Sequence, residues 1–94
     1  MERNQRPTDP GRILRVYFLN ERGVSIAQFA RATGLSRSHV SNIVNGKVTV
    51  TPETAFRFAR VLDTTPEFWL NLQTAVDLYD VGKKLAKWRP VESL

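Results

Sequence analysis

The sequence predicts an all-α fold of five helices. Apolar residues recur at the three- and four-residue spacing of a helix through most of the 94 residues. A capping residue precedes each such segment, and glycine or asparagine follows several of them. Strand signals are almost absent, because the only run rich in β-branched residues, "KVTVT" at 47–51, is too short to anchor a sheet.

The first helix is predicted from about Pro10 to Asn20. Asp9 can cap its N-terminus, and proline suits the first helical position because the N–H that it lacks would have no partner there. Gly23 suits the C-terminus, where a left-handed backbone conformation is common. The predicted apolar stripe of this helix consists of Ile13, Leu14, Tyr17 and Phe18.

The second and third helices are predicted to follow Ser25 and Ser36, whose hydroxyl groups can cap free N–H groups. The second ends near Gly34, which can adopt a positive φ, and the third closes at Asn45 and Gly46. Their apolar positions are Ile26, Phe29 and Ala30 in the second and Val40, Ile43 and Val44 in the third.

The fourth and fifth helices both begin at "TPE", with threonine as the cap and proline in the first position. The fourth starts at Pro52, and the fifth runs from Pro66 to about Val81. We expect one domain over 1–94, with these two helices at about 52–81 and a short tail at 82–94. The predicted core residues are Ala55, Phe58, Ala59 and Leu62 in the fourth helix and Phe68, Trp69, Leu72, Ala75, Val76 and Tyr79 in the fifth.

Residues 25–46 have the pattern of a helix-turn-helix, in which two helices of about nine residues are joined by a turn that contains glycine. Ala30 is small enough to let the two helices approach each other, and Leu35 would fill the corner between them. Val40 and Ile43 would anchor the second helix of the motif to the core. The opposite face of that helix would therefore project from the surface.

The projecting face carries Arg37, Ser38, Ser41 and Asn42. Arginine can donate two hydrogen bonds to guanine, asparagine can pair with adenine, and serine suits either. We therefore predict that these four residues read base edges in double-stranded DNA. An ordinary solvated helix face of the same composition is the alternative.

The charge is distributed unevenly along the chain. Residues 1–50 contain eight lysines and arginines against three acids, whereas residues 51–94 contain six of each. Excess positive charge around the helix-turn-helix favours a polyanionic partner, because each neutralised phosphate releases counterions. A protein whose surface charge is merely lopsided is the other interpretation.

The sequence lacks the residue sets of catalytic and metal sites. It has no cysteine and one histidine, His39, and Asp77 and Asp80 stand without catalytic partners. We predict no enzyme activity, metal or cofactor. The first twelve residues lack the apolar core of a secretory signal, and no apolar run could span a bilayer, so we expect a cytoplasmic protein without a membrane partner. His39 is expected to be solvated or to donate a hydrogen bond to a phosphate.

The stretch "SIAQFARATGLSRSHVSNIVNGK" resembles the helix-turn-helix of the Cro/C1-type (Xre-like) repressors, which have a lambda-repressor-like fold. The next block, "TPETAFRFARVLDTTPEFWLNLQTAVDL", resembles the HigA-type (VapI-like) antitoxins of bacterial toxin–antitoxin pairs, and the resemblance covers residues 7 to about 81. It implies a bacterial repressor that binds a palindromic operator of its own operon. It also implies that the protein neutralises a HigB-like toxin, an mRNA endonuclease.

The resemblance assigns roles to individual residues. The base-reading positions of such repressors match Arg37, Ser38 and Asn42, with Ser41 beside them. Their phosphate contacts match Ser25, Gln28, Ser36, Asn45 and Lys47. Val44 departs from the wider family, where an acidic residue often stands, and we interpret it as a core residue.

A second apolar stripe on the last predicted helix consists of Leu70, Thr74, Leu78 and Val81. A chain of this size has little reason to leave such a stripe exposed. We predict that the stripe meets a second copy of the chain, since the resemblance implies a homodimer. The alternative is that the tail folds back over it through Leu85 or Trp88. A toxin would dock on folded surface or on the N-terminal arm at 1–9.

Two other functions remain open on the sequence. One is a solitary helix-turn-helix regulator without a toxin partner. The other is a protein-interaction domain that uses this fold without DNA, and it would show no salt-dependent retention on duplex DNA.

Overall fold

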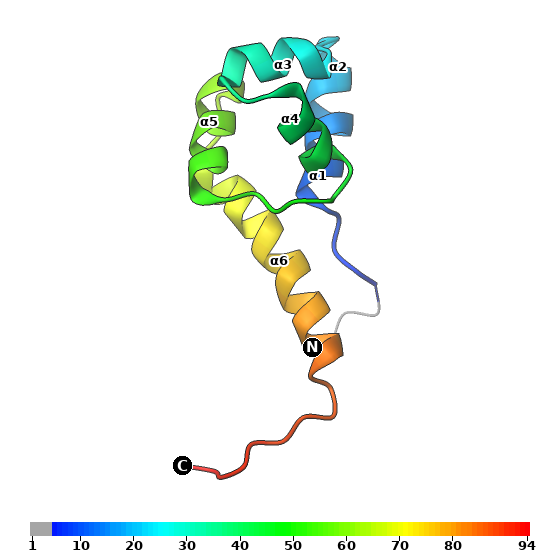
Figure 1. The fold of residues 1–94 in the computed structure, drawn as a ribbon, viewed down its shortest axis with the longest axis vertical. Coiled ribbons are helices and arrows are strands. Elements are labelled where there is room, and N and C mark those ends of the chain that lie inside the picture. Colours follow the sequence, from blue (N-terminus) through cyan, green and yellow to red (C-terminus); the bar gives the residue numbers. More distant parts are fainter. Residues whose placement is uncertain (1–4) are drawn as a thin grey trace.

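The computed structural model describes residues 5–94, which form helices joined by short turns (Figure 1). The first predicted helix is a continuous run of α1 (Pro10–Ile13), the π-helical segment η1 (Leu14–Leu19) and α2 (Asn20–Arg22). The other four are α3 (Ile26–Thr33), α4 (Arg37–Val44), α5 (Pro52–Leu62) and α6 (Pro66–Lys84). The predicted all-α fold of five helices is confirmed. Within residues 5–94, no helix combines the length and apolar character needed to cross a membrane.

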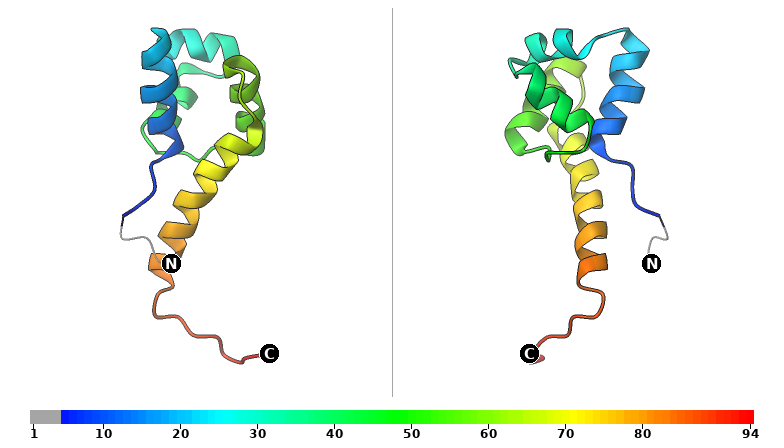
Figure 2. Two further views of the ribbon diagram at one scale, coloured as in Figure 1. Left: turned by 180° about the vertical axis from the view of Figure 1, so that it is seen from behind. Right: turned by 45° about the vertical axis from the view of Figure 1, so that its right-hand side comes forward.

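The helices are arranged as a rounded unit from which the last helix projects (Figures 1 and 2). In Figure 1, α3 crosses the top, α1 and α5 lie on opposite sides, and α4 lies between them. The second half of α6 and the tail that follows it extend well beyond this unit, and the molecule measures 51 × 24 × 23 Å along its principal axes.

The predicted caps start the helices. A side-chain oxygen of each capping residue accepts a hydrogen bond from a backbone N–H in the first turn of its helix. The five capping residues are Asp9, Ser25, Ser36, Thr51 and Thr65. Gly23 and Gly34 end helices in the left-handed conformation, with φ of 64° and 74°. Local capping chemistry therefore sets most of the helix boundaries.

The first helix contains a wide turn that its sequence pattern does not reveal. The N–H of Asn20 donates to the carbonyl oxygen of Arg15, five residues earlier rather than four. This spacing brings both Leu14 and Leu19 into the core, where they are 0% and 2% exposed. The prediction that Tyr17 faces the core is wrong, because the wide turn rotates it outward to 63% exposure.

The last helix continues to Lys84, so the prediction that it ends before Gly82 is wrong. A glycine in a helix interior costs only about 1 kcal/mol relative to alanine, which does not end a long helix by itself. Leu85 caps the C-terminus, and the remaining tail projects away from the rest of the molecule (Figures 1 and 2). The alternative in which the tail folds back over α6 is therefore also wrong.

Aromatic rings form the centre of the core. Trp69 is fully buried, and its ring centroid lies 5.2 Å from that of Phe18, 5.3 Å from Phe58 and 5.0 Å from Phe68. The indole Nε1 donates to Thr64 Oγ1 at 2.8 Å, so the polar atom of this large side chain has a partner. The prediction that Trp69 is a core residue is confirmed, whereas Phe68 is 39% exposed at the edge of the cluster.

Candidate nucleic-acid interface

The two helices of the predicted motif are α3 and α4, and each begins at a serine. Ser25 Oγ accepts from the N–H of Gln28 at 3.0 Å, while Gln28 Oε1 accepts from the N–H of Ser25 at 2.8 Å. Ser36 Oγ accepts from the N–H of His39 at 3.0 Å. Each serine uses its oxygen as an acceptor, so its hydroxyl hydrogen can still be donated to a ligand.

The turn between α3 and α4 is supported by an arginine from another helix. Gly34 supplies the positive φ at the turn. Arg57 of α5 donates through Nη1 to the carbonyl oxygen of Thr33 at 2.7 Å, and its Nε contacts Glu53 Oε2 at 3.1 Å. Arg57 therefore holds the C-terminal end of α3. Sequence reasoning missed this role, since an arginine on a helix surface gives no signal of a partner 24 residues away.

The apolar face of α4 anchors it to the core as predicted. Val40 and Ile43 are 0% and 1% exposed, and Leu35 and Val44 pack against the same cluster. Ala30 is buried on the facing side of α3. The interpretation of Val44 as a packing residue is thus consistent with its position.

The opposite face of α4 is open to solvent. Arg37 and Ser38 are exposed, and Ser41 and Asn42 are half-buried at its margin. Within residues 5–94, the side chains of Arg37, Ser38 and Asn42 make no hydrogen bond or ion pair, and Asn45 Nδ2 lies 3.4 Å from Ser41 Oγ. These polar groups are therefore available to a ligand. The N-terminal end of α4 adds the partial positive charge of the helix dipole beside Arg37.

The predicted phosphate contacts all lie on the surface. They stand at the start of α3 and at the two ends of α4, and all five are exposed: Ser25, Gln28, Ser36, Asn45 and Lys47. The chain turns sharply after α4 at Gly46, where φ is 71°. This turn leaves the side chain of Lys47 free of any ion pair within the described part of the chain.

His39 differs from its expected role. The side chain is half-buried, and Nε2 is enclosed without a hydrogen-bond partner among residues 5–94. The expectation that His39 is simply solvated is therefore wrong for Nε2. Donation of a hydrogen bond to a phosphate stays a prediction.

The comparisons with known proteins agree with this geometry. A family model described as helix-turn-helix matches residues 17–69. The antitoxin HigA-1 of Vibrio cholerae serotype O1 is 46% identical over 80 residues, which cover 85% of this chain and 75% of that protein. This chain belongs to the family of HigA-type helix-turn-helix antitoxins.

Solved structures resemble this HigA-type chain over nearly its whole length. The antitoxin GraA matches with a TM-score of 0.90 at 43% identity, over 97% of this chain and 100% of that one. The Pseudomonas aeruginosa antitoxin HigA, solved with the higBA promoter, matches with a TM-score of 0.84 at 34% identity, over 93% and 100%. The resemblance seen in the sequence is confirmed.

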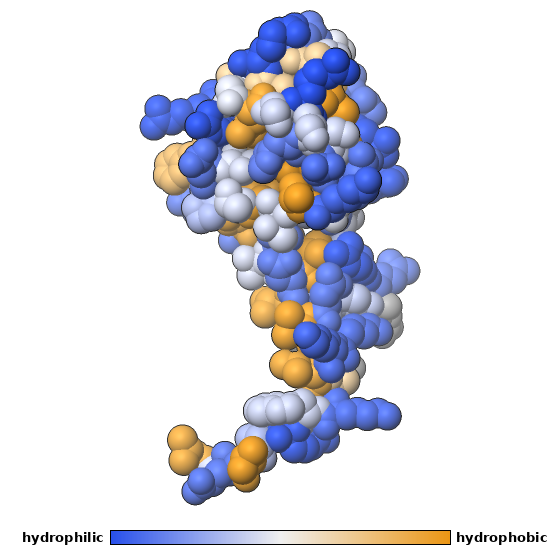
Figure 3. All heavy atoms as spheres, viewed as in Figure 1, coloured by the Kyte–Doolittle hydropathy of each residue, from blue (hydrophilic) through white to orange (hydrophobic). Residues whose placement is uncertain are grey.

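The C-terminal part of the predicted second stripe of this HigA-type chain lies on the projecting half of α6. Leu78 and Val81 are 68% and 49% exposed, whereas Leu70 packs partly against the core. Leu85 caps the end of this helix and Trp88 lies in the tail beyond it, and both are also exposed. Figure 3 shows hydrophobic side chains following one edge of α6 below the more hydrophilic helical unit. Thr74 is exposed on the same helix.

Proposed function

We propose that this HigA-type protein is a homodimeric, DNA-binding repressor of its own operon that also neutralises a HigB-like toxin. The observation that supports DNA binding is the open polar face of α4, held in place by buried Val40 and Ile43. The P. aeruginosa antitoxin HigA, similar over 93% of this chain, was solved with its promoter. The shared fold favours the same type of ligand here.

The four residues of the α4 face have complementary roles in the proposed complex. Arg37 donates two hydrogen bonds to a guanine, and Asn42 pairs with an adenine in the major groove. Ser38 and Ser41 bond to neighbouring base edges. Each good bidentate contact contributes about 1–3 kcal/mol of discrimination against a wrong base.

The backbone contacts surround this face. The capping hydroxyls of Ser25 and Ser36 donate to phosphate oxygens, as do the amides of Gln28 and Asn45. Lys47 supplies a positive charge that neutralises a phosphate and releases counterions.

Two copies joined through the α6 stripe would present two α4 helices to one duplex. Half-sites about 34 Å apart, one helical turn, are the spacing that such dimers require. The operator is therefore expected to be palindromic.

The DNA proposal is tested with the duplex upstream of the gene itself and with random duplexes. Arg37→Ala and Asn42→Ala are each expected to relax the preference at one base pair. Lys47→Ala is expected to weaken binding to all DNA sequences similarly. It should also lower the slope of log affinity against log salt concentration by about one unit. Arg60→Ala, on the exposed side of α5, is the control and should behave as wild type. If Arg37→Ala keeps the full operator preference, the assigned reading face is wrong.

The toxin proposal is tested by co-expression with the product of the neighbouring gene. We expect the two proteins to copurify, and we expect cells that express the toxin to recover growth when this protein is co-expressed. If no copurifying protein is found and repression persists, the solitary regulator without a toxin is the correct function. If the protein shows no salt-dependent retention on duplex DNA, a protein-interaction domain is the correct class. Part of the predicted docking arm, residues 1–4, lies outside the residues that the structure describes.

A further inference from the structure

A hollow of about 320 Å³ lies between the first turns of the chain and the end of α4. Three arginines line it, namely Arg6, Arg12 and Arg15. Asp9 lines it as well, and Asn45 and Gly46 form its border with the turn that follows α4. This hollow is outside the two-helix motif but adjoins the end of its reading helix.

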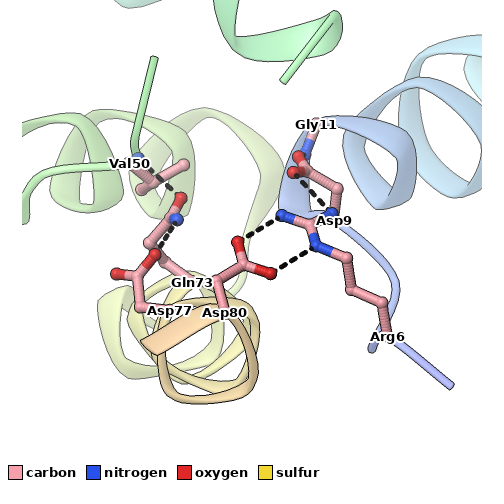
Figure 4. Close-up of polar contacts among 7 residues, drawn as sticks. All are labelled: Arg6, Asp9, Gly11, Val50, Gln73, Asp77 and Asp80. Carbon is pink, nitrogen blue, oxygen red and sulfur yellow. Dashed lines mark hydrogen bonds and ion pairs between the residues drawn. The ribbon is translucent and has the colours of Figure 1, made fainter. Parts of the chain in front are cut away.

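The three arginines are not equivalent. Arg6 donates through Nε and Nη2 to the carboxyl oxygens of Asp80 at 2.9 and 3.0 Å, and its Nη1 lies 3.9 Å from Asp9 (Figure 4). Arg12 and Arg15 are exposed and form no ion pair or hydrogen bond through their side chains within residues 5–94. Arg6 and Asp80 neutralise each other. Arg12 and Arg15 then carry two positive charges against the one negative charge of Asp9, which leaves a net charge of +1 in the hollow.

The walls of the hollow are held firmly. Gly11 is buried against the backbone of Ile43, which joins the start of α1 to the end of α4. Asp9 Oδ1 accepts from the N–H of Gly11 at 2.9 Å (Figure 4). Its other oxygen, Oδ2, lies toward Gly46. The backbone of the first turn, from which Arg12 projects, is therefore held in place relative to α4.

We propose that this hollow receives a phosphate of the DNA backbone, held by Arg12 and Arg15. The proposal rests on the proposed function, and it adds a backbone contact outside the helix-turn-helix. Asn45 lines the hollow and Lys47 follows two residues later, and both are predicted phosphate contacts. The hollow therefore lies at the edge of the surface that is expected to contact DNA. Guanidinium groups suit the role, because their fork of N–H donors matches the oxygens of a phosphate.

The test compares salt slopes of operator binding for wild type and the double variant Arg12→Gln/Arg15→Gln. Loss of one phosphate contact is expected to lower the slope by about 0.9. Base preference should not change, because a phosphate contact carries no sequence information. Lys47→Gln is the positive control, and Arg60→Gln on α5 is the matched control that should keep the wild-type slope.

Ethylation interference on the wild-type complex gives a second measurement that does not depend on a double variant. We expect one interfering phosphate that persists in Lys47→Gln and disappears in Arg12→Gln alone. Circular dichroism and thermal unfolding check that each variant is folded.

The outcomes separate this proposal from the proposed function. Wild type without salt-dependent duplex binding overturns the proposed function and with it the phosphate site. A lowered slope in Lys47→Gln but not in the double variant overturns the phosphate site alone. Unchanged DNA binding with weaker toxin copurification in the double variant also overturns it, and assigns the hollow to the toxin interface.

Discussion

Gly11, in the first turn of α1, lies directly against the backbone of Ile43 near the end of α4. A β-carbon at Gly11 would overlap the carbonyl oxygen of Ile43 and stand 2.9 Å from the Cα of Val44. Only glycine allows two helices to approach this closely without a shift of backbone. The contact ties the first helix of the chain to the reading helix.

Gly11→Ala is therefore expected to destabilise the protein by about 1–3 kcal/mol, because the methyl group meets rigid backbone rather than a flexible side chain. Urea unfolding measures this change. Gly82→Ala is the matched control, since nothing lies within 4 Å of the added carbon in the interior of α6. That control should gain up to about 1 kcal/mol in helix propensity. A Gly11→Ala variant as stable as wild type would contradict the close contact.

Gln73 connects α6 to the segment that follows α4. Its Oε1 accepts from the N–H of Val50 at 2.9 Å, and its Nε2 donates to Asp77 Oδ1 at 2.9 Å (Figure 4). Gln73 is one of the few buried polar residues.

Gln73→Leu is expected to lower the free energy of unfolding by about 1–3 kcal/mol, because the buried N–H of Val50 loses its acceptor. Asn71→Leu, an exposed position on the same helix, should change it by less than about 0.5 kcal/mol. Equal effects of the two substitutions in urea unfolding would contradict the assigned role of the Gln73 amide.

Arg6 fastens the N-terminal arm to α6 through Asp80. Two hydrogen bonds from Arg6 lower the pKa of the Asp80 carboxyl below its ordinary value. A lowered pKa in the folded state means that the pair stabilises the fold above the ordinary aspartate pKa of about 3.9, and that this contribution is lost as the pH falls through the lowered pKa.

Asp80→Asn should therefore be less stable than wild type at neutral pH, and the difference should vanish in strong acid. Urea midpoints measured between pH 7 and pH 2.5 check this. Glu92→Gln in the exposed tail serves as the control and should show no such difference. A gap between wild type and Asp80→Asn that stays constant with pH would exclude the ion pair as its cause.

The exposed α6 stripe is expected to hold the dimer together. Leu78→Lys combined with Val81→Lys should produce a monomer in sedimentation, because two charges cannot be buried in an apolar contact without partners. Operator affinity should fall as well, since the half-sites then bind independently. Val91→Lys makes the same chemical change in the exposed tail and should leave the dimer intact. A dimer that survives the double substitution would place the interface elsewhere.

The first and last helices show where sequence patterns fail. Tyr17 was predicted to face inward from a regular spacing, but the wide turn in η1 rotates it out and brings Leu19 in. Gly82 was predicted to end the last helix, yet a single exposed glycine costs too little to do so. One error concerns which side of a helix a residue occupies, and the other concerns where a helix ends. Free-energy differences of about 1 kcal/mol are enough to decide either.

The sequence by itself determined the helix starts, the turn at Gly34 and the polar face of α4. Each of these depends on hydrogen bonds and backbone angles within a few residues, so the local residue types are sufficient. Tertiary structure alone decided which polar side chains meet across the fold. Arg57 reaches Thr33, Gln73 reaches Val50 and Arg6 reaches Asp80 over 24, 23 and 74 residues. Such partners depend on the path of the whole chain, and an arginine or glutamine on a helix has the same local pattern whether it contacts water or a distant carbonyl.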